Sequence, residues 1–228
     1  NEMISRECED DTIVGYSENI RTAGNTLLGI VNDILDFSKI EAGKLEIIPV
    51  EYDLSSVISD LVNMVKTKVD DKRLRLNLDI DRNIPKFLYG DEIRIKQIVT
   101  NILTNAVKYT ETGYVALNVF FKKINEESIK LCVSVEDTGI GIKEEDIKKL
   151  FSAFERIEEK RNRSIEGTGL GMNITRRLLN MMGSDLNVQS VYGEGSEFSF
   201  ELEQPVINWH ELGDFEESLR NALSQRKK

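Results

Sequence analysis

The sequence predicts an α+β fold, a two-layer sandwich in which helices cover one face of a mixed β-sheet, with a long additional helix at the N-terminus. Segments with the two-residue period of strands are interspersed with segments of helical spacing. The last two strand segments are adjacent and are joined by Tyr-Gly-Glu-Gly, a hairpin sequence. Helical spacing continues without interruption over about residues 10–42. Elements mixed in this way favour helices packed on one side of a sheet.

The composition is that of an ordinary globular protein. The chain has 228 residues, 40% hydrophobic and 31% charged, enough for one core and an accessory element. The net charge of −10 argues against nucleic acid or an anionic membrane as the main partner. Two cysteines, Cys8 and Cys132, form no disulfide framework, which indicates a reducing, cytoplasmic compartment. No apolar run reaches membrane-spanning length, but the first residue, Asn1, indicates a piece of a longer protein, so a membrane-anchored parent stays open.

The N-terminal helix is predicted to need a partner. Its apolar residues recur at spacings of three and four, as in a coiled-coil seam, and three glycines weaken it intrinsically. Leu28, Val31 and Leu35 widen the apolar face to that of a multi-helix bundle, while docking on its own domain is the alternative. Gly43 is placed to end the helix. The seam consists of Ile13, Tyr16, Ile20, Ala23, Leu27, Ile30, Ile34 and Phe37.

Ten further segments follow. Six have the period of strands: about residues 45–52, 74–80, 114–122, 129–136, 186–191 and 196–202. Four have helical spacing: about residues 53–67, 91–109, 143–150 and 170–182. Asp53 and Asp91 stand where helix N-caps belong, and Pro85 is expected to break the chain. The tail Asp214–Gln225 is expected to form a short helix.

One predicted strand delivers an acid to the buried face of the sheet. From Ile129 to Val135 apolar and polar residues alternate, and the next inward position is Asp137. Gly139 and Gly141 follow, which removes side-chain bulk beside the carboxylate. An ionised carboxylate only accepts hydrogen bonds, so the exocyclic amine of adenine suits it, whereas guanine would present a carbonyl. The alternative is an aspartate that merely starts a turn at the strand end.

The helix over residues 91–109 has a polar face that also includes Arg94 and Gln97. Asn101 and Asn105 lie one turn apart on it, although asparagine is a mediocre helix former. An amide oxygen suits Mg²⁺, which prefers few protein ligands together with phosphates and water. Asn101 and Asn105 are therefore both candidate ligands, and Lys108 would reach the phosphates. A plain solvated face is the alternative.

A glycine-rich segment, Gly167–Gly171, opens the last helix. Backbone N–H groups at such a helix start cradle phosphate, although the spacing is neither the Rossmann nor the Walker A pattern. The charged segment before it resembles a lid, with Phe151 and Phe154 able to anchor its start. Its cations Arg156, Lys160, Arg161 and Arg163 are candidates to contact the terminal phosphate, and a solvated loop is the alternative.

Together, these segments resemble the catalytic ATP-binding module of sensor histidine kinases, in the ATPase superfamily shared with gyrase, mismatch-repair ATPases and a heat-shock chaperone. The family's boxes occur in family order over about residues 45–204. The N box corresponds to 97–109, the first glycine box to 137–142, the F box to 151–154, the second glycine box to 167–172 and the final glycine element to 193–198. The resemblance implies a Bergerat-type fold, ATP and Mg²⁺ as cofactors, and transfer of the γ-phosphoryl group to a histidine.

The resemblance also implies site residues. Asn105 would bind Mg²⁺, Asp137 adenine, and Lys108 and Thr168 the phosphates, while Tyr109 would border the base. Asn101, Asn105 and Lys108 would form the catalytic set. The nucleotide-binding residues would be Asn105, Lys108, Tyr109, Asp137, Gly139, Gly141, Ile142, Phe154, Arg161, Gly167, Thr168, Gly169, Leu170 and Gly171.

Residues 27–45 resemble the second helix of the family's dimerisation and phosphoacceptor hairpin, in the style of hybrid sensor kinases. This divides the chain into a partial hairpin at 1–44, a catalytic domain at 45–204, and a tail or linker at 205–228. It implies a homodimer through the N-terminal helix, and as partners a hairpin that carries the acceptor histidine and a response-regulator receiver domain. The only histidine, His210, lies outside the family's acceptor motif, so the chain is expected to bind ATP without autophosphorylating.

Asn101 separates related classes of enzyme. Hydrolytic relatives have a glutamate four residues before the Mg²⁺-binding asparagine, where it activates water as a general base. Asn101 occupies that position and cannot take up a proton at neutral pH, so we expect it to suppress hydrolysis. A hydrolytic ATPase of the chaperone or topoisomerase type, and a nucleotide-regulated dimerisation scaffold, remain the alternatives.

Overall fold

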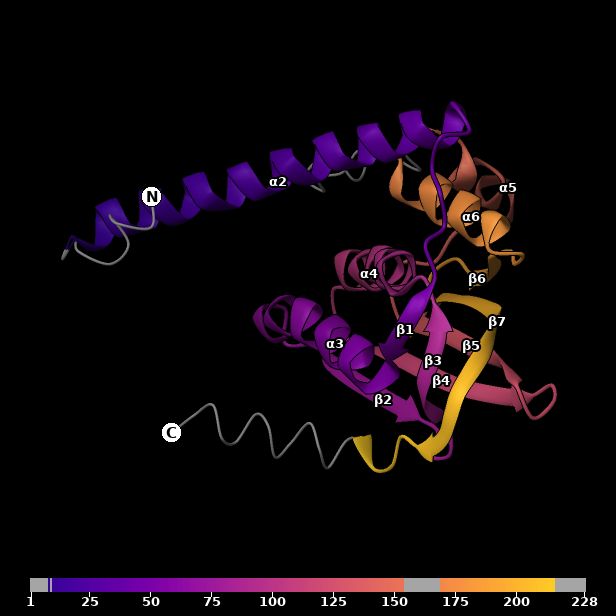
Figure 1. The fold of residues 1–228 in the computed structure, drawn as a ribbon. Helices are drawn as coiled ribbons and strands as arrows, with labels where there is room; N and C mark the ends of the chain where they lie inside the picture. Colours follow the sequence, from indigo (N-terminus) through magenta and orange to yellow (C-terminus); the bar gives the residue numbers. More distant parts are fainter. Residues whose placement is uncertain (1–7, 9, 154–168, 216–228) are drawn as a thin grey trace.

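The structure, a computed structural model, describes residues 8, 10–153 and 169–215. Figure 1 shows a domain of one sheet and several helices, with a long helix lying across one end. The helices are α2 (Asp11–Glu41), α3 (Leu54–Asp71), α4 (Glu92–Tyr109), α5 (Glu144–Ile147), the 3₁₀ helix η1 (Lys149–Phe151) and α6 (Gly171–Met181). The strands are β1 (Val50–Asp53), β2 (Arg75–Ile80), β3 (Pro85–Gly90), β4 (Tyr114–Lys123), β5 (Ser128–Asp137), β6 (Asn187–Val191) and β7 (Gly195–Glu211).

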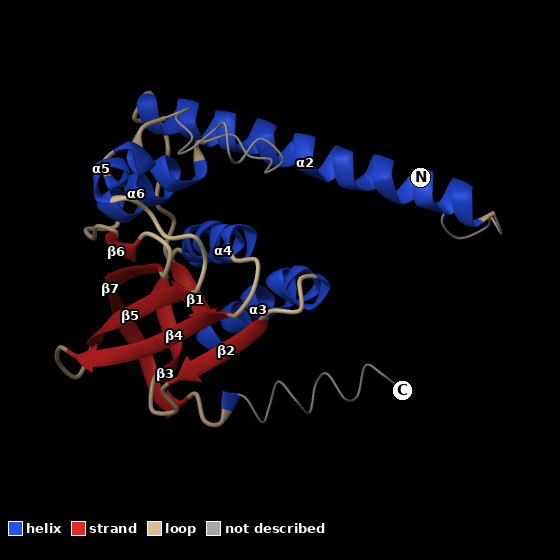
Figure 2. Cartoon of the chain, turned by 180° about the vertical axis from the view of Figure 1, so that it is seen from behind, coloured by secondary structure: helices blue, strands red, loops and turns tan. Residues whose placement is uncertain are grey.

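The strands form one mixed sheet. Its order is β1-β3-β7-β5-β4-β2, and β6 pairs with β7 beside this path. β2 and β4 are parallel, whereas the other pairs are antiparallel. Helices α3, α4 and α6 lie on one side of the sheet, as Figures 1 and 2 both show. The predicted α+β architecture is confirmed.

The core lies between the sheet and these helices. The predicted apolar stripe of α4, from Ile95 to Val107, is buried, as is the stripe of α3 from Leu54 to Val65. Each fully buried aliphatic side chain contributes on the order of 1.5–3 kcal/mol relative to an exposed one. Because the apolar stripe is held against the sheet, the opposite rotation of α4 is excluded and its polar face is turned toward α6 and the end of α2.

Three predicted details were wrong. Pro85 does not break the chain but begins β3, since a proline at the first position of a strand removes no required ladder bond. β7 continues through residue 204 to Glu211, and its last part pairs with β3, so the domain boundary expected at 204 falls inside a strand. β1 begins at Val50 rather than at 45. The helix expected at Asp214–Gln225 lies almost entirely outside the described residues.

Among the described residues, α2 is docked on the domain through its C-terminal end. Asp10 caps its start by accepting hydrogen bonds from the backbone of Thr12 and Ile13, and Gly43 follows its end with φ +64°. Its first part projects beyond α3 and α4 in both views (Figures 1 and 2), and seam residues such as Tyr16 and Ile20 are more than 60% exposed. No helix within the described residues has the length and apolar character to cross a membrane.

The docked end of α2 is held by charge as well as by apolar contact. The Asp36 carboxylate accepts hydrogen bonds from Arg94 Nη1 at 3.1 Å and Gln97 Nε2 at 2.8 Å, both on α4. Arg177 of α6 pairs with Glu41 at 2.5 Å. Arg94 and Gln97, which were predicted to lie on the polar face of α4, therefore connect α4 to α2.

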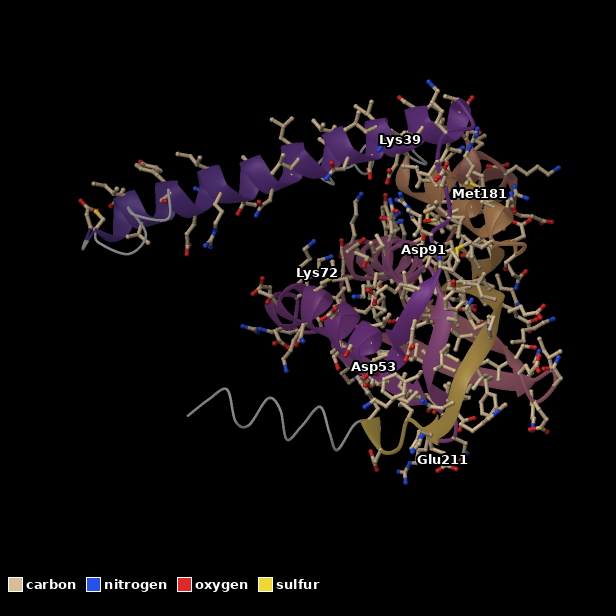
Figure 3. All side chains as sticks on the ribbon, viewed as in Figure 1. Lys39, Asp53, Lys72, Asp91, Met181 and Glu211 are labelled. Carbon is tan, nitrogen blue, oxygen red and sulfur yellow. The ribbon has the colours of Figure 1, made fainter. Side chains whose placement is uncertain are left out.

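Side-chain hydrogen bonds hold both ends of α4. Asp91 caps the N-terminus through Oδ1, which accepts from Arg94 N at 3.0 Å, while its Oδ2 accepts from Ile48 N in the linker after α2 at 2.8 Å. Lys72, at the end of α3, donates from Nζ to the carbonyls of Val107, Lys108 and Thr110. Figure 3 labels both Asp91 and Lys72. A cation on otherwise unpaired carbonyls opposes the negative end of the helix dipole.

Candidate functional site

Asp137 ends β5 with its carboxylate in the interior. Burial alternates along β5 as predicted, and Asp137 is only 6% exposed. Its Oδ1 accepts a hydrogen bond from Gly139 N at 2.8 Å. Burial raises the pKa of Asp137 from 3.8 to about 6, against the backbone N–H groups of Gly139 and Ser196, which lower it. The group is therefore ionised at neutral pH but poorly compensated, as expected for an acceptor that serves a ligand.

The two glycines after Asp137 allow a close approach of backbones. A Cβ on Gly139 would lie 2.6 Å from the carbonyl oxygen of Tyr109 at the end of α4. Gly141 has φ +64°, and a Cβ there would collide with the carbonyl oxygen of Val191 at the end of β6. The glycines were predicted to open space beside the carboxylate. What the structure shows is that they let the loop pack between α4 and the β6–β7 hairpin.

Further hydrogen bonds fix this loop. Ile142 N donates to Ser190 Oγ on β6 at 2.7 Å, and Gly193 N donates to the Ile140 carbonyl at 2.8 Å. Ile140 N donates to the carbonyl of Tyr109 at 3.3 Å. The acid at the end of β5 is thereby held at a fixed position relative to the C-terminal turn of α4.

The polar residues of α4 differ in their contacts. Lys108 Nζ lies 5.0 Å from the centre of the Tyr109 ring, a cation–π contact beside the Asp137 loop. Asn105, half-buried, makes no side-chain hydrogen bond to any other described residue. Asn101 donates from Nδ2 to the Gly171 carbonyl and to Thr175 Oγ1 on α6, at 3.3 Å each. The Asn105 amide thus has no partner among the described residues, whereas the Asn101 amide, one turn earlier, joins α4 to α6.

The first backbone N–H groups of α6 lie ahead of its helical hydrogen bonds. Gly169 has φ +72°, Leu170 is fully buried, and the helix starts at Gly171 without a side-chain N-cap. The first helical hydrogen bond runs from Ile174 N to the Leu170 carbonyl, so the preceding N–H groups have no partner within the helix. N–H groups at the positive end of a helix suit an anion. The predicted ligand residues Phe154, Arg161, Gly167 and Thr168 lie outside the described residues.

The site residues come from three elements on one end of the domain: the end of β5, the last turns of α4 and the start of α6. The polar groups at this site fit an adenine nucleotide and Mg²⁺. A buried acceptor would receive an amine, a bare helix start would receive phosphate, and a free amide oxygen suits a hard cation. Within the described residues no group of three or more His, Cys, Asp or Glu side chains could hold a metal ion. Phosphate oxygens and water would therefore complete the coordination around Asn105.

A family comparison agrees with this arrangement. The family described as "Histidine kinase-, DNA gyrase B-, and HSP90-like ATPase" matches residues 90–206, from the end of β3 into β7. The chain belongs to this ATPase family. The resemblance noted from the sequence boxes is thereby confirmed, and Asp137, Asn105 and Gly171 all lie within the matched part of this histidine kinase-like ATPase.

Curated relatives of this ATPase chain are sensor histidine kinases. Hybrid signal transduction histidine kinase B of Dictyostelium discoideum is 39% identical over 207 residues, 91% of this chain and 10% of that protein. Sensor histidine kinase GacS of Pseudomonas protegens is 40% identical over 190 residues, 83% of this chain and 21% of that protein. The chain thus spans only about a tenth to a fifth of the length of these relatives.

Solved structures resemble the chain in fold. Full-length ShkA in complex with AMPPNP has a TM-score of 0.68 and 28% identity, covering 88% of this chain and 40% of ShkA. The catalytic domain of histidine kinase ThkA has a TM-score of 0.53 and 24% identity, covering 69% of this chain and 97% of ThkA; this likeness concerns the fold alone. The larger coverage by ShkA extends the likeness beyond the catalytic domain.

Sequence reasoning missed the contacts that position the site. Thr175 and Lys72 were not singled out, and Arg94 and Gln97 were not linked to Asp36. The sequence gives one signal, the threonine inside the helix at 170–182, because threonine is a poor helix former and a hydroxyl in a helix interior needs a partner. The remaining contacts join segments far apart in the chain, which local periodicity does not reveal.

Proposed function

We propose that this chain is the ATP- and Mg²⁺-binding catalytic part of a two-component sensor histidine kinase, which transfers the γ-phosphoryl group of ATP to a histidine on a dimerisation hairpin. The buried Asp137 carboxylate carries the proposal. It is ionised at neutral pH, can then only accept hydrogen bonds, and lies beside the end of α4. Membership of the ATPase family, the relatives' description as histidine kinases and the AMPPNP complex of ShkA support it.

Each element has a distinct role in this proposal. Asp137 accepts the adenine amine, and Tyr109 borders the base. The bare start of α6, with Lys108 and residues of the preceding segment, binds the phosphates. Asn105, with Asn101 as a second candidate, holds Mg²⁺, which when bound neutralises charge on the transferred phosphoryl group. These residues orient the nucleotide; in phosphoryl transfer most catalysis comes from positioning and charge stabilisation.

The larger assembly follows the same proposal. Residues 1–44 form part of the dimerisation hairpin, and the exposed apolar seam of α2 pairs with a second copy and with the helix that carries the acceptor histidine. The catalytic domain extends from residue 45 through the end of β7. A receiver domain takes the phosphoryl group from the histidine, and the domain works in the cytoplasm. Nucleic acid is no partner of this acidic chain.

Incubation of the chain with γ-labelled ATP is expected to give no stable label, because its only histidine, His210, lies on the exposed end of β7 rather than on a hairpin. Addition of a hairpin that carries the acceptor histidine should produce acid-labile phosphate on the hairpin. Gel separation after acid and alkali treatment measures this. Stable label on His210, absent in His210→Gln, would contradict the prediction; ATP binding without any transfer would instead favour the scaffold alternative.

Steady-state ATP hydrolysis by the wild type is expected to be slow, because Asn101 supplies no general base. Asn101→Glu places a carboxylate at that position, and we expect hydrolysis to rise about 100-fold or more, in the range that general-base catalysis provides. The same substitution loses the amide donor to Gly171, so thermal unfolding should be followed in parallel. Fast hydrolysis by the wild type, unchanged in Asn101→Glu, would count against the role of Asn101.

A further inference from the structure

The polar link between α4 and α6 determines which way the Asn101 amide faces. The carbonyl of Gly171 can only accept a hydrogen bond, so the group of Asn101 that approaches it at 3.3 Å must be the amide nitrogen. A second acceptor, Thr175 Oγ1, lies at the same distance one turn further along α6. With Nδ2 directed to α6 by two acceptors, Oδ1 has to point away from them.

Thr175 stands out among the residues of α6. Its side chain is fully buried, in a helix interior where threonine is disfavoured relative to alanine or leucine. A buried hydroxyl without a partner costs free energy, and its partner here is Asn101 on another helix. Valine has the same shape and would serve for packing alone. The hydroxyl is therefore explained by the link to Asn101.

The link joins two groups that the proposed function uses together. Asn105 lies one turn after Asn101 on α4, and the uncapped N-terminus of α6 begins at Gly171. A Cβ on Gly171 would lie 3.7 Å from Asn101 Cγ, so the amide packs directly on the start of α6. Any shift of α6 along α4 would break both hydrogen bonds and change the distance between the metal-binding amide and the phosphate-binding N–H groups.

We propose that Thr175 is a positioning residue for the triphosphate: with the Gly171 carbonyl it orients the Asn101 amide and thereby holds the start of α6 at the correct distance from Asn105. This inference rests on the proposed binding of Mg·ATP. Loss of the link should affect the phosphate end of the nucleotide and not the adenine end. The link lies beside the phosphate-binding start of α6, whereas the adenine is received by Asp137 at the end of β5.

The test compares ATP with adenosine in the whole chain. Thr175→Val keeps shape and removes the hydroxyl, and we expect ATP affinity with Mg²⁺ to fall about fivefold, the equivalent of one net hydrogen bond, while adenosine affinity stays within about twofold. Thr175→Ser keeps the hydroxyl and should bind ATP like the wild type. Thr110→Val is the matched control, since it also loses a fully buried hydroxyl, but one bonded to its own helix at Ala106.

A double-mutant cycle measures the coupling between Thr175 and Asn101 in ATP affinity, which a general loss of stability would not produce. In the Asn101→Ala background, Thr175→Val should change ATP affinity less than about twofold, because the partner of the hydroxyl is already absent. If Thr175→Val does not fold, Asn101→Asp tests the link from α4, since a carboxylate cannot donate to Gly171, and it should again weaken ATP selectively.

The outcomes separate this inference from the proposed function. Equal ATP affinity in wild type and Thr175→Val, or an equal loss for ATP and adenosine, would overturn the positioning role, as would full additivity with Asn101→Ala. A wild type that binds neither ATP nor adenosine would overturn the proposed function itself. Calorimetric titration of each variant with ATP, with and without Mg²⁺, and with adenosine decides between these results.

Discussion

Asp137→Asn is expected to weaken ATP binding about 100-fold at neutral pH. The carboxylate is acceptor-only, so it can receive the adenine amine, whereas an amide loses the charge-assisted bond and can turn its own NH₂ toward that amine. A lost charged hydrogen bond and an unpaired buried donor each cost about 1–3 kcal/mol, and about 2.7 kcal/mol corresponds to 100-fold in affinity. Calorimetric titration with ATP measures the change.

The neighbouring residue, Glu136, provides a control that is matched in charge. Glu136 belongs to the opposite face of β5, where it accepts a hydrogen bond from the Tyr114 hydroxyl at 2.6 Å. Glu136→Gln also removes one negative charge from the end of this strand, and ATP affinity should stay within about twofold of the wild type. An ATP affinity of Asp137→Asn that equals that of Glu136→Gln would remove the basis of the adenine assignment.

The same substitution should have the opposite effect on the stability of the ligand-free protein. The folded pKa of Asp137, about 6, lies above its ordinary value of 3.8, so the stability contributed by the protonated form is lost as the pH rises from about 4 to above 6. Asparagine does not ionise. The difference in unfolding free energy, Asp137→Asn minus wild type, should therefore increase by about 2–3 kcal/mol between pH 4 and pH 7.5. Urea unfolding at several pH values checks this, and a pH-independent difference would contradict it.

The fold was predictable where local pattern and packing agree. α3 and α4 have apolar stripes of helical period and aspartate caps, and both appear where the pattern placed them. Pro85 shows the limit, because a proline predicts an interruption of the chain, yet at the first position of β3 it costs no ladder bond. The extension of β7 to Glu211 depends on pairing with β3, more than 100 residues earlier in the chain, and the alternation of its last residues is weak.

The candidate site was predictable where one residue type implies one chemistry. Strict alternation in β5 was enough to place Asp137 on the buried face, and the structure confirms that burial. The position of Asn105 on the polar face of α4 followed from helical spacing. The links that set the distances could not be predicted: Lys72 reaches α4 from α3, and Thr175 reaches Asn101 from α6. These contacts depend on how helices pack, which one sequence does not specify residue by residue.

Asn105→Ala is expected to remove the dependence of ATP binding on Mg²⁺. Asn105 is the half-buried amide of α4 that has no hydrogen-bond partner among the described residues, whereas the Asn101 nitrogen is committed to α6. Without its oxygen the cation would keep only phosphate and water ligands. We expect transfer to a histidine-bearing hairpin in trans to fall at least about 100-fold, as for loss of a preorganised electrostatic group, with little change in ATP affinity measured in EDTA.

The comparison with and without metal separates this role from simple destabilisation. Asn63 on the exposed face of α3 is the matched control, and Asn63→Ala should leave both transfer and the Mg²⁺ dependence unchanged. If Asn105→Ala retained the full effect of Mg²⁺ while Asn101→Ala lost it, the ligand would be the earlier asparagine. Thr175 would then hold the Asn101 oxygen toward the metal. The Mg²⁺ dependence of the two alanine variants therefore decides whether Asn105 or Asn101 is the ligand.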